Sequence, residues 1–346
     1  MAKPGLVERL KDGPLICAEG YVFELERRGY VQAGPFVPQV VLENPDAVTE
    51  LHREFMLAGS DVVLALTYYA HRAKLEVINI TESLEEVNRR ALQIARGVAD
   101  EFGALTAGNI CNTNVYNPDE PDTLAPVRAM FEEQIGWAAN EGVDYIVGET
   151  FPFFGEALIG LETIQQAGLP AVITLAVHRN GRLRDGMDPV EACRRLRDAG
   201  AEVVGLNCIR GPNTMLPLMK AIAAEVKPPL AALPVAYRTT EAQPTFQSLD
   251  DEAGIRPPHG CCFPTALDPF TCTRYDIAAF TDQAAALGYN YLGVCCGAAP
   301  HHIRAMAEAL GRTPPASRFS PDMTRHFAFG ADHTAKAHDR DFQNQL

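Results

Sequence analysis

The sequence predicts an α/β protein built on one (β/α)8 TIM barrel, with a long insertion after the seventh strand and a C-terminal extension. Eight short apolar segments alternate with longer segments of helical periodicity, and most helical segments stop at glycine. The chain has 346 residues, which suits one barrel with additions. A doubly wound open sheet is the alternative, but no G-x-G-x-x-G motif follows the first strand.

The eight predicted strands are apolar along almost their whole length, which is typical of strands buried on both faces of a parallel barrel. They cover residues 15–19, 61–69, 104–110, 145–150, 171–177, 203–208, 230–235 and 291–296. Helical periodicity with start and stop signals predicts helices at 44–59, 83–103, 123–142, 188–200 and 275–288.

Two segments depart from the repeating β/α unit. Residues 236–270 form a connection rich in proline and threonine, and connections of that length are usually functional or run over the surface. We therefore expect one barrel domain at 1–312. Residues 313–346 are polar and interrupted by proline, and we expect this extension to wrap around the barrel or a neighbouring subunit.

The overall composition excludes several classes of partner. With 30 basic and 44 acidic residues, the formal charge is −14, which argues against nucleic acids and anionic membranes. No secretory signal is visible, and no run of about 18 apolar residues predicts a membrane span. Nine cysteines in a chain without an export signal indicate a cytoplasmic protein whose clustered cysteines bind metal or catalyse.

Three cysteines fall at the ends of predicted strands, where barrel active sites form. Cys208 ends the sixth strand, and Cys295 and Cys296 end the eighth. Adjacent residues of a regular strand point to opposite faces, so both reach one ion only if the chain turns there, which Gly297 permits. Three thiolates leave one open position on a tetrahedral Zn²⁺, as in a catalytic zinc site.

An open zinc position suggests activation of a substrate thiol. Zinc coordination deprotonates a thiol, and the resulting thiolate attacks a methyl group carried by a cationic nitrogen or sulfur. Such an onium group is bound best by aromatic faces. Aromatic residues near predicted strand ends are Phe36, Tyr68, Tyr69, Phe151, Phe153 and Phe154. Ordinary packing is the alternative for each phenylalanine.

The motifs GLNC at 205–208 and GVCCG at 293–297 together resemble the zinc signature of the homocysteine S-methyltransferases, most closely the betaine–homocysteine S-methyltransferases. The likeness covers nearly the whole chain, and segment 330–342 resembles that group's C-terminal oligomerisation arm. Further similar segments lie at 27–48, 51–59, 234–239 and 295–310.

The resemblance implies a zinc enzyme that methylates homocysteine to methionine as a homo-oligomer, a dimer or a tetramer. It implies Cys208, Cys295 and Cys296 as zinc ligands. For homocysteine it implies the carboxylates Glu19 and Glu149, with Gly20 beside them.

For the methyl donor, the resemblance implies a pocket formed by Tyr69, Phe36, Tyr68 and Thr150. Four residues depart from the usual pattern: Glu19 replaces Asp, Tyr21 replaces Gly, Phe36 replaces Trp, and Thr150 replaces Tyr. Two aromatic rings of the donor cage are thus weakened or lost. A betaine, a sulfonium such as S-methylmethionine or dimethylsulfoniopropionate, and a cyclic betaine all remain open as donors.

Other interpretations also stay open. A corrinoid-dependent methyltransferase would need a second protein, and a non-catalytic zinc barrel that senses thiols is a rival of another class. The pair Cys261 and Cys262 suggests a second metal site, a thiol switch or, as we favour, packing near the barrel mouth. His301 and His302 are expected to start the last helix rather than bind metal.

Overall fold

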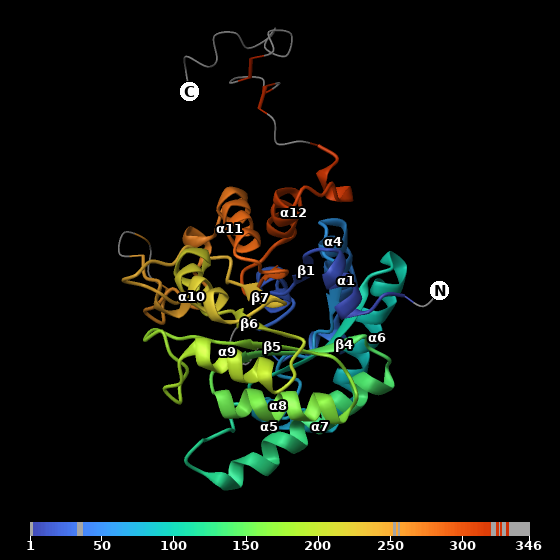
Figure 1. Ribbon diagram of the computed structural model, residues 1–346. Coiled ribbons are helices and arrows are strands. Elements are labelled where there is room, and N and C mark those ends of the chain that lie inside the picture. The colour runs from blue at the N-terminus through green and yellow to red at the C-terminus, as the bar shows by residue number, and fades with distance from the viewer. Residues whose placement is uncertain are drawn as a thin grey trace.

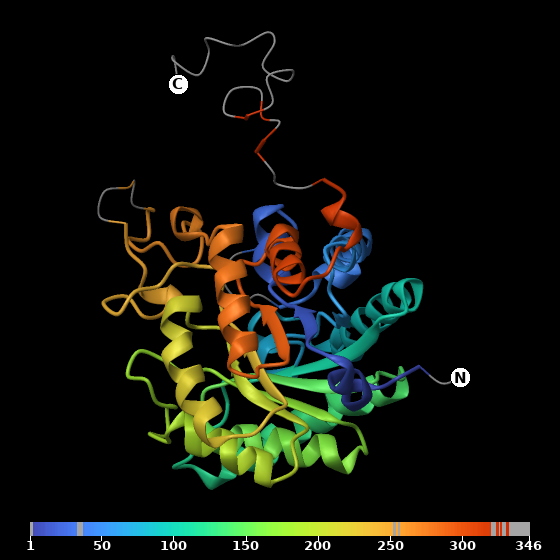
Figure 2. The ribbon, with the colours of Figure 1, turned by 45° about the horizontal axis from the view of Figure 1, so that its top comes forward.

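The computed structural model describes residues 3–32, 37–251, 254, 257–319, 323, 324, 326, 330 and 331, and it confirms the predicted barrel. Eight parallel strands close into one sheet in chain order, and helices surround it (Figures 1 and 2). The strands are β1 (Leu15–Ala18), β2 (Val62–Leu64), β3 (Leu105–Cys111), β4 (Tyr145–Phe151), β5 (Ala171–Leu175), β6 (Val203–Asn207), β7 (Leu230–Leu233) and β8 (Tyr291–Val294).

All five predicted helices are present, as α4, α6, α7, α9 and α11. Two further barrel helices, α8 and α10, were not predicted, because two glycines interrupt the first and Pro217 lies inside the second. The α-helices are α1 (Leu6–Asp12), α2 (Tyr21–Arg27), α3 (Val40–Glu43), α4 (Pro45–Leu57), α5 (Arg72–Val77), α6 (Leu84–Phe102), α7 (Leu124–Asn140), α8 (Phe154–Gln166), α9 (Pro189–Asp198), α10 (Pro212–Glu225), α11 (Arg274–Ala286) and α12 (Pro300–Ala309).

Most strands end earlier than their apolar runs predicted. β2 ends at Leu64 rather than at residue 69, and β8 ends at Val294 rather than at residue 296. The chain leaves the sheet through left-handed backbone conformations, with φ of 60° at Tyr69, 57° at Cys208 and 82° at Gly297. These turns direct the predicted site residues into the barrel mouth.

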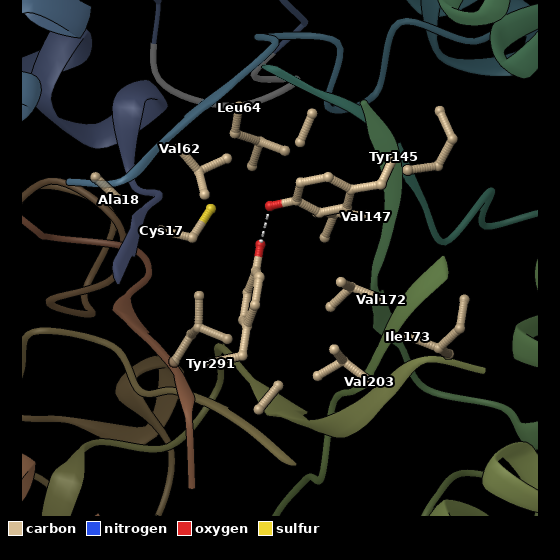
Figure 3. Close-up of a cluster of buried hydrophobic side chains, with 14 of the residues drawn as sticks. Cys17, Ala18, Val62, Leu64, Tyr145, Val147, Val172, Ile173, Val203 and Tyr291 are labelled. Carbon is tan, nitrogen blue, oxygen red and sulfur yellow. Dashed lines mark hydrogen bonds between the residues drawn. The ribbon is translucent and has the colours of Figure 1, made fainter. Parts of the chain in front are cut away.

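The interior of the barrel is filled near the start of the strands. Tyr145 and Tyr291 open β4 and β8, and their rings point to one another across the barrel with hydroxyls 2.9 Å apart (Figure 3). Each hydroxyl therefore has a partner in an otherwise apolar layer that includes Val62, Val172 and Val203. This layer closes the barrel below the mouth, so a ligand site is left only at the carboxyl ends of the strands.

A recurring side-chain contact joins strands where they begin. A polar residue directly before each even-numbered strand accepts a hydrogen bond from a backbone N–H at the start of the preceding strand. These contacts are Asp61 to Ile16 (2.7 Å), Asp144 to Thr106 (2.7 Å), Glu202 to Ala171 (2.7 Å) and Asn290 to Leu230 (3.1 Å).

The connection after β7 packs over the barrel mouth. A bridge between Tyr237 and Thr271 closes it at its base, and the Phe246 N–H donates to the carbonyl of Ile209 at 2.9 Å. The predicted excursion is thus tied to the turn that follows Cys208. Most of the C-terminal extension, including nearly all of 330–342, lies outside the described residues. Among the residues that are described, no helix is long and apolar enough to cross a membrane.

We expect Asp61→Ala to lower the free energy of unfolding by about 1–3 kcal/mol, because the buried Ile16 N–H loses its acceptor. The same carboxylate also pairs with Arg312 at 2.7 Å. Urea denaturation measures the change. Asp198→Ala, which removes only an exposed ion pair with Arg194, serves as the control and should leave stability unchanged. Equal stability of both variants would show that the contact contributes nothing.

Candidate active site

The three predicted metal-binding cysteines come together at the barrel mouth. The sulfur atoms of Cys208 and Cys296 are 3.5 Å apart, and those of Cys295 and Cys296 are 3.9 Å apart. All three sulfur atoms lie within 4.8 Å of one another. A tetrahedral ion with Zn–S distances of about 2.3 Å places its sulfur ligands about 3.8 Å apart. The donor set therefore fits zinc in both chemistry and spacing.

The turn after β8 brings two consecutive cysteines to this one centre. The Cys295 N–H donates to the Pro234 carbonyl at 2.8 Å, and the Ala298 N–H donates to the Cys295 carbonyl at 3.0 Å. A Cβ on Gly297, where φ is 82°, would approach the Tyr237 ring to 2.5 Å, so only glycine fits. The expected turn out of the strand is therefore confirmed.

The thiols of this cluster perturb one another. Hydrogen bonds from Cys295 and Cys296 hold the pKa of Cys208 well below that of an ordinary thiol. The same contacts, together with burial, raise the pKa values of Cys295 and Cys296 well above the ordinary value. Without a cation, the cluster thus favours one shared negative charge over three.

Two carboxylates lie directly beside the cysteines. Glu19 follows β1 and Glu149 lies in β4, and a carboxylate oxygen of each is within 4.8 Å of the other and of the Cys295 sulfur. They are 2% and 4% exposed. Neither has an ion-pair partner among the described residues, and both oxygens of Glu19 also lack a hydrogen-bond partner there. The ionised form of such buried carboxylates would be stabilised by a cation.

Burial and mutual repulsion govern the protonation of this pair. Burial raises the pKa of Glu149 to about 7. Burial, followed by the charge of Glu149, raises the pKa of Glu19 well above the usual carboxyl value. Gly20, next to Glu19, has φ of 88°, and a Cβ there would lie 2.5 Å from the Cys295 carbonyl. Without a side chain at Gly20, the end of β1 can lie close to the end of β8.

Asn207, the last residue of β6, orients Glu149. Its amide nitrogen donates to a Glu149 oxygen at 2.8 Å and to the Thr150 hydroxyl at 2.9 Å. Its carbonyl oxygen accepts from the Thr150 N–H at 2.8 Å and from the Thr174 hydroxyl at 2.9 Å. The other Glu149 oxygen accepts from Asn109 at 2.6 Å. Both asparagines were missed as positioning residues, since an inward polar residue on a strand has no distinctive motif.

A cavity of about 240 Å³ joins the cysteines, the carboxylate pair and the predicted donor residues. Its wall includes Gly20, Tyr68, Tyr69 and Thr150, all of which were predicted from the sequence. Phe36, predicted beside them, lies outside the described residues. Thr150 has φ of 60°, which is strained for a β-branched residue and coincides with an irregularity in the pairing of β4 with β5.

Three aromatic residues near the predicted strand ends take the ordinary packing that was the alternative for each of them. Phe151 is fully buried against Phe131, and Phe153 packs on Tyr116. Phe154 begins α8 and lies under the guanidinium of Arg195. None of the three lines the cavity. Phe151 directly follows Thr150, whose φ is 60°, and its ring points to α7 in the helical layer.

The cavity instead contains three phenylalanines that the sequence did not single out. Phe23 lies on α2, and Phe246 and Phe263 lie in the insertion after β7. They are far apart in the sequence and follow no periodicity, so only the folded insertion reveals that they share one wall.

The remaining sequence predictions separate into structural and exposed positions. Cys262 is 4% exposed and packs in the apolar cluster of the barrel mouth, as favoured, whereas Cys261 is exposed with its sulfur 3.4 Å from His259 Nδ1. His302 accepts from the Ala299 N–H at 3.1 Å, which confirms its expected place at the start of α12.

The barrel mouth thus combines a cluster of three cysteines with a buried pair of carboxylates, at the end of the barrel where enzymes of this fold have their active sites. The family model of the homocysteine S-methyltransferases matches residues 15–310 of the chain. The chain belongs to this family, and its activity is methyl transfer to homocysteine.

Characterised relatives include enzymes that use two kinds of donor. The chain is 37% identical to betaine–homocysteine S-methyltransferase 1 of Xenopus tropicalis, over 95% of this chain and 81% of that protein. It is 35% identical to S-methylmethionine–homocysteine S-methyltransferase BHMT2 of Pongo abelii, over 91% of this chain and 85% of that protein.

A solved structure shares the fold. The metallated form of the homocysteine methyltransferase MmuM from Escherichia coli superimposes with a TM-score of 0.67. The superposition covers 87% of this chain and 98% of that one, at 18% sequence identity.

We expect Asn207→Ala to lower the free energy of unfolding by at least about 2 kcal/mol, because the buried Thr150 N–H and Thr174 hydroxyl lose their acceptor. Chemical denaturation followed by circular dichroism measures this. Asn112→Ala is the matched control, since that buried side chain donates only one bond, to the Thr150 carbonyl at 3.1 Å. A loss no larger than that of the control would contradict the central place given to Asn207.

Proposed function

We propose that the chain is a zinc-dependent enzyme that transfers a methyl group from a betaine-like onium donor to homocysteine, giving methionine. The observation that carries the proposal is the sulfur triad of Cys208, Cys295 and Cys296 directly beside the unpaired carboxylates of Glu19 and Glu149. A thiol-binding centre and an ammonium-binding centre lie within the reach of one short amino thiol.

The chain's own residues hold homocysteine in one orientation. Glu19 and Glu149 bind its ammonium group, and Asn109 and Asn207 fix the Glu149 carboxylate through both oxygens. Gly20 leaves room for the close contact of the two strand ends. The substrate sulfur then faces the cysteine triad, and its carbon chain lies along the apolar part of the cavity.

The triad would hold Zn²⁺, which when bound supplies a deprotonated and strongly nucleophilic substrate thiolate. A sulfur lone pair forms the new S–CH₃ bond as the bond from that methyl group to nitrogen or sulfur breaks. The electron pair of the broken bond stays on the donor, which leaves as a neutral amine or thioether. The cavity aligns both reactants, and alignment supplies a large part of the rate.

The names of the relatives support an onium donor, a betaine in one case and S-methylmethionine in the other. Tyr68, Tyr69 and Thr150 line the cavity, and we propose that they contribute to the donor pocket together with Phe36. A tyrosine in place of Thr150 would narrow the site, so this chain has space for a donor larger than glycine betaine.

We further propose that the enzyme works in the cytoplasm as a homo-oligomer, with 313–346 as the oligomerisation arm. The nine cysteines are all free, and a reduced triad requires a reducing compartment.

Methionine formation from homocysteine tests the proposal directly. The purified protein, loaded with zinc, is offered glycine betaine, a cyclic betaine, S-methylmethionine and dimethylsulfoniopropionate, and methionine is measured by mass spectrometry. We expect turnover with at least one donor. Absence of methionine with every donor would remove the proposed reaction.

Metal content gives a second test. We expect about one zinc per chain, and Cys208→Ala should lose it together with activity, because two thiolates alone bind zinc much more weakly. Cys193→Ala, a fully buried cysteine in α9, is the control and should keep its zinc. Elemental analysis of both purified variants measures the metal. Full zinc content in Cys208→Ala would place the metal elsewhere.

We expect Glu149→Gln to raise the KM for homocysteine about 10- to 100-fold, because a charged hydrogen bond to the ammonium group is lost. The KM for the donor should change little. Glu156→Gln is the control, since this buried carboxylate bonds only to Thr113 and does not line the cavity. Steady-state kinetics with each substrate varied in turn distinguishes the two effects.

A further inference from the structure

We propose that the rings of Phe23, Phe246 and Phe263 form the surface that binds the onium group of the methyl donor. We call these three side chains the phenylalanine wall. The inference rests on the proposed function and assigns the donor's cationic centre to residues of α2 and the insertion, while the tyrosines after β2 line the remainder of the donor pocket.

The phenylalanine wall is a preformed aromatic corner. The rings of Phe246 and Phe263 are perpendicular, at 86° with centroids 5.1 Å apart. Phe23 lies 5.9 Å from Phe246 and 6.5 Å from Phe263, tilted by 56° and 50°. All three side chains line the same cavity, so they present aromatic surface to one volume, as the residues that bind a methylated cation do.

The phenylalanine wall is held rigidly. Phe246 is 3% exposed and stacks on Tyr237 at 12° and 6.0 Å, which leaves its orientation fixed. The hydroxyl of Tyr237 in turn accepts from Arg27 at 2.8 Å. Thr245 and Ser248 close a capping box around the turn that carries Phe246. A rigid ring binds a cation without losing side-chain entropy.

The phenylalanine wall also lies next to the sulfur triad. The backbone N–H of Phe246 bonds to Ile209, the neighbour of Cys208, at 2.9 Å. Phe23, Phe246, Cys208 and Cys295 belong to one apolar cluster, with Phe263 and Cys296 packed against it. In an in-line transfer to a sulfur at the triad, the onium centre lies on the far side of the methyl group from that sulfur. The phenylalanine wall lines the cavity beside the triad, so it can bind the onium centre there.

The ring of Tyr69, the alternative binding surface for the onium group, already contacts a cation of the chain itself. The ammonium nitrogen of Lys74 lies 4.3 Å from the centroid of the Tyr69 ring. Tyr69 also packs in a separate cluster with Leu75 and Trp137. An onium group on the same ring would meet a like charge.

The charge preference of binding tests the inference. The probes are glycine betaine with its neutral carbon analogue 3,3-dimethylbutanoate, and dimethylsulfoniopropionate with its analogue 4-methylpentanoate. Affinities are measured by ligand-observed NMR. The sample is the full chain loaded with zinc, without homocysteine or any of its analogues. We expect the wild type to prefer at least one onium over its analogue. Phe246→Leu and Phe263→Leu should each reduce this preference about 3- to 30-fold, the size of one cation–π contact.

Phe270→Leu is the matched control, because this ring packs against the same apolar cluster without lining the cavity, and it should keep the preference. Transferred NOE measurements locate the probe. Onium methyl protons should show contacts to ring protons that vanish when phenylalanine is ring-deuterated and persist when tyrosine is. The inference would be overturned if Tyr69→Leu lost the preference for the onium over its neutral analogue while both wall variants kept it. It would also be overturned if the wild type preferred neither onium over its analogue.

The outcome separates this inference from the proposed function. If the protein forms methionine but the wall variants keep the preference for the onium, the phenylalanine wall is rejected and the methyltransferase proposal stands. Failure to form methionine rejects the proposed donor chemistry, and the NMR binding data alone then decide where an onium group binds.

Discussion

Buried acidic groups without a matching cation are the constraint around which this protein is organised. Glu19, Glu149 and the cysteine triad lie within a few ångströms of one another, and neither carboxylate has an ion-pair partner among the described residues. Such an arrangement is costly on its own. It becomes favourable when cations arrive, and each species proposed for the site is cationic: a zinc ion, an amino-acid ammonium group and an onium centre.

The barrel withstands this repulsion because the charged residues are attached to a rigid frame. The Asn207 side chain makes hydrogen bonds to Glu149, Thr150 and Thr174, and Asn109 holds the second oxygen of Glu149. Below them, the hydroxyls of Tyr145 and Tyr291 satisfy one another within an apolar layer. Polar residues before the even-numbered strands fix where neighbouring strands begin. The site thus gains its precision from hydrogen bonds that the substrates do not touch.

The sequence predicted the barrel well, since strands buried on both faces appear as continuous apolar runs that composition alone makes visible. It also predicted that Cys208, Cys295 and Cys296 meet, because strand ends converge in a closed barrel. It did not predict where strands stop, because left-handed backbone at residues such as Tyr69 depends on tertiary contacts. Nor did it predict the phenylalanine wall, since Phe23, Phe246 and Phe263 come from segments without periodicity that only the folded insertion brings together.

The left-handed backbone at Tyr69, Thr150 and Cys208 has an implication for protein engineering. Each such residue costs on the order of 1–3 kcal/mol relative to a relaxed conformation. Selection for heat resistance would therefore favour glycine at the same positions that place side chains in the barrel mouth. Thermostable versions of this enzyme are more safely sought in the outer helices, where rigidity and turnover do not compete for the same residues.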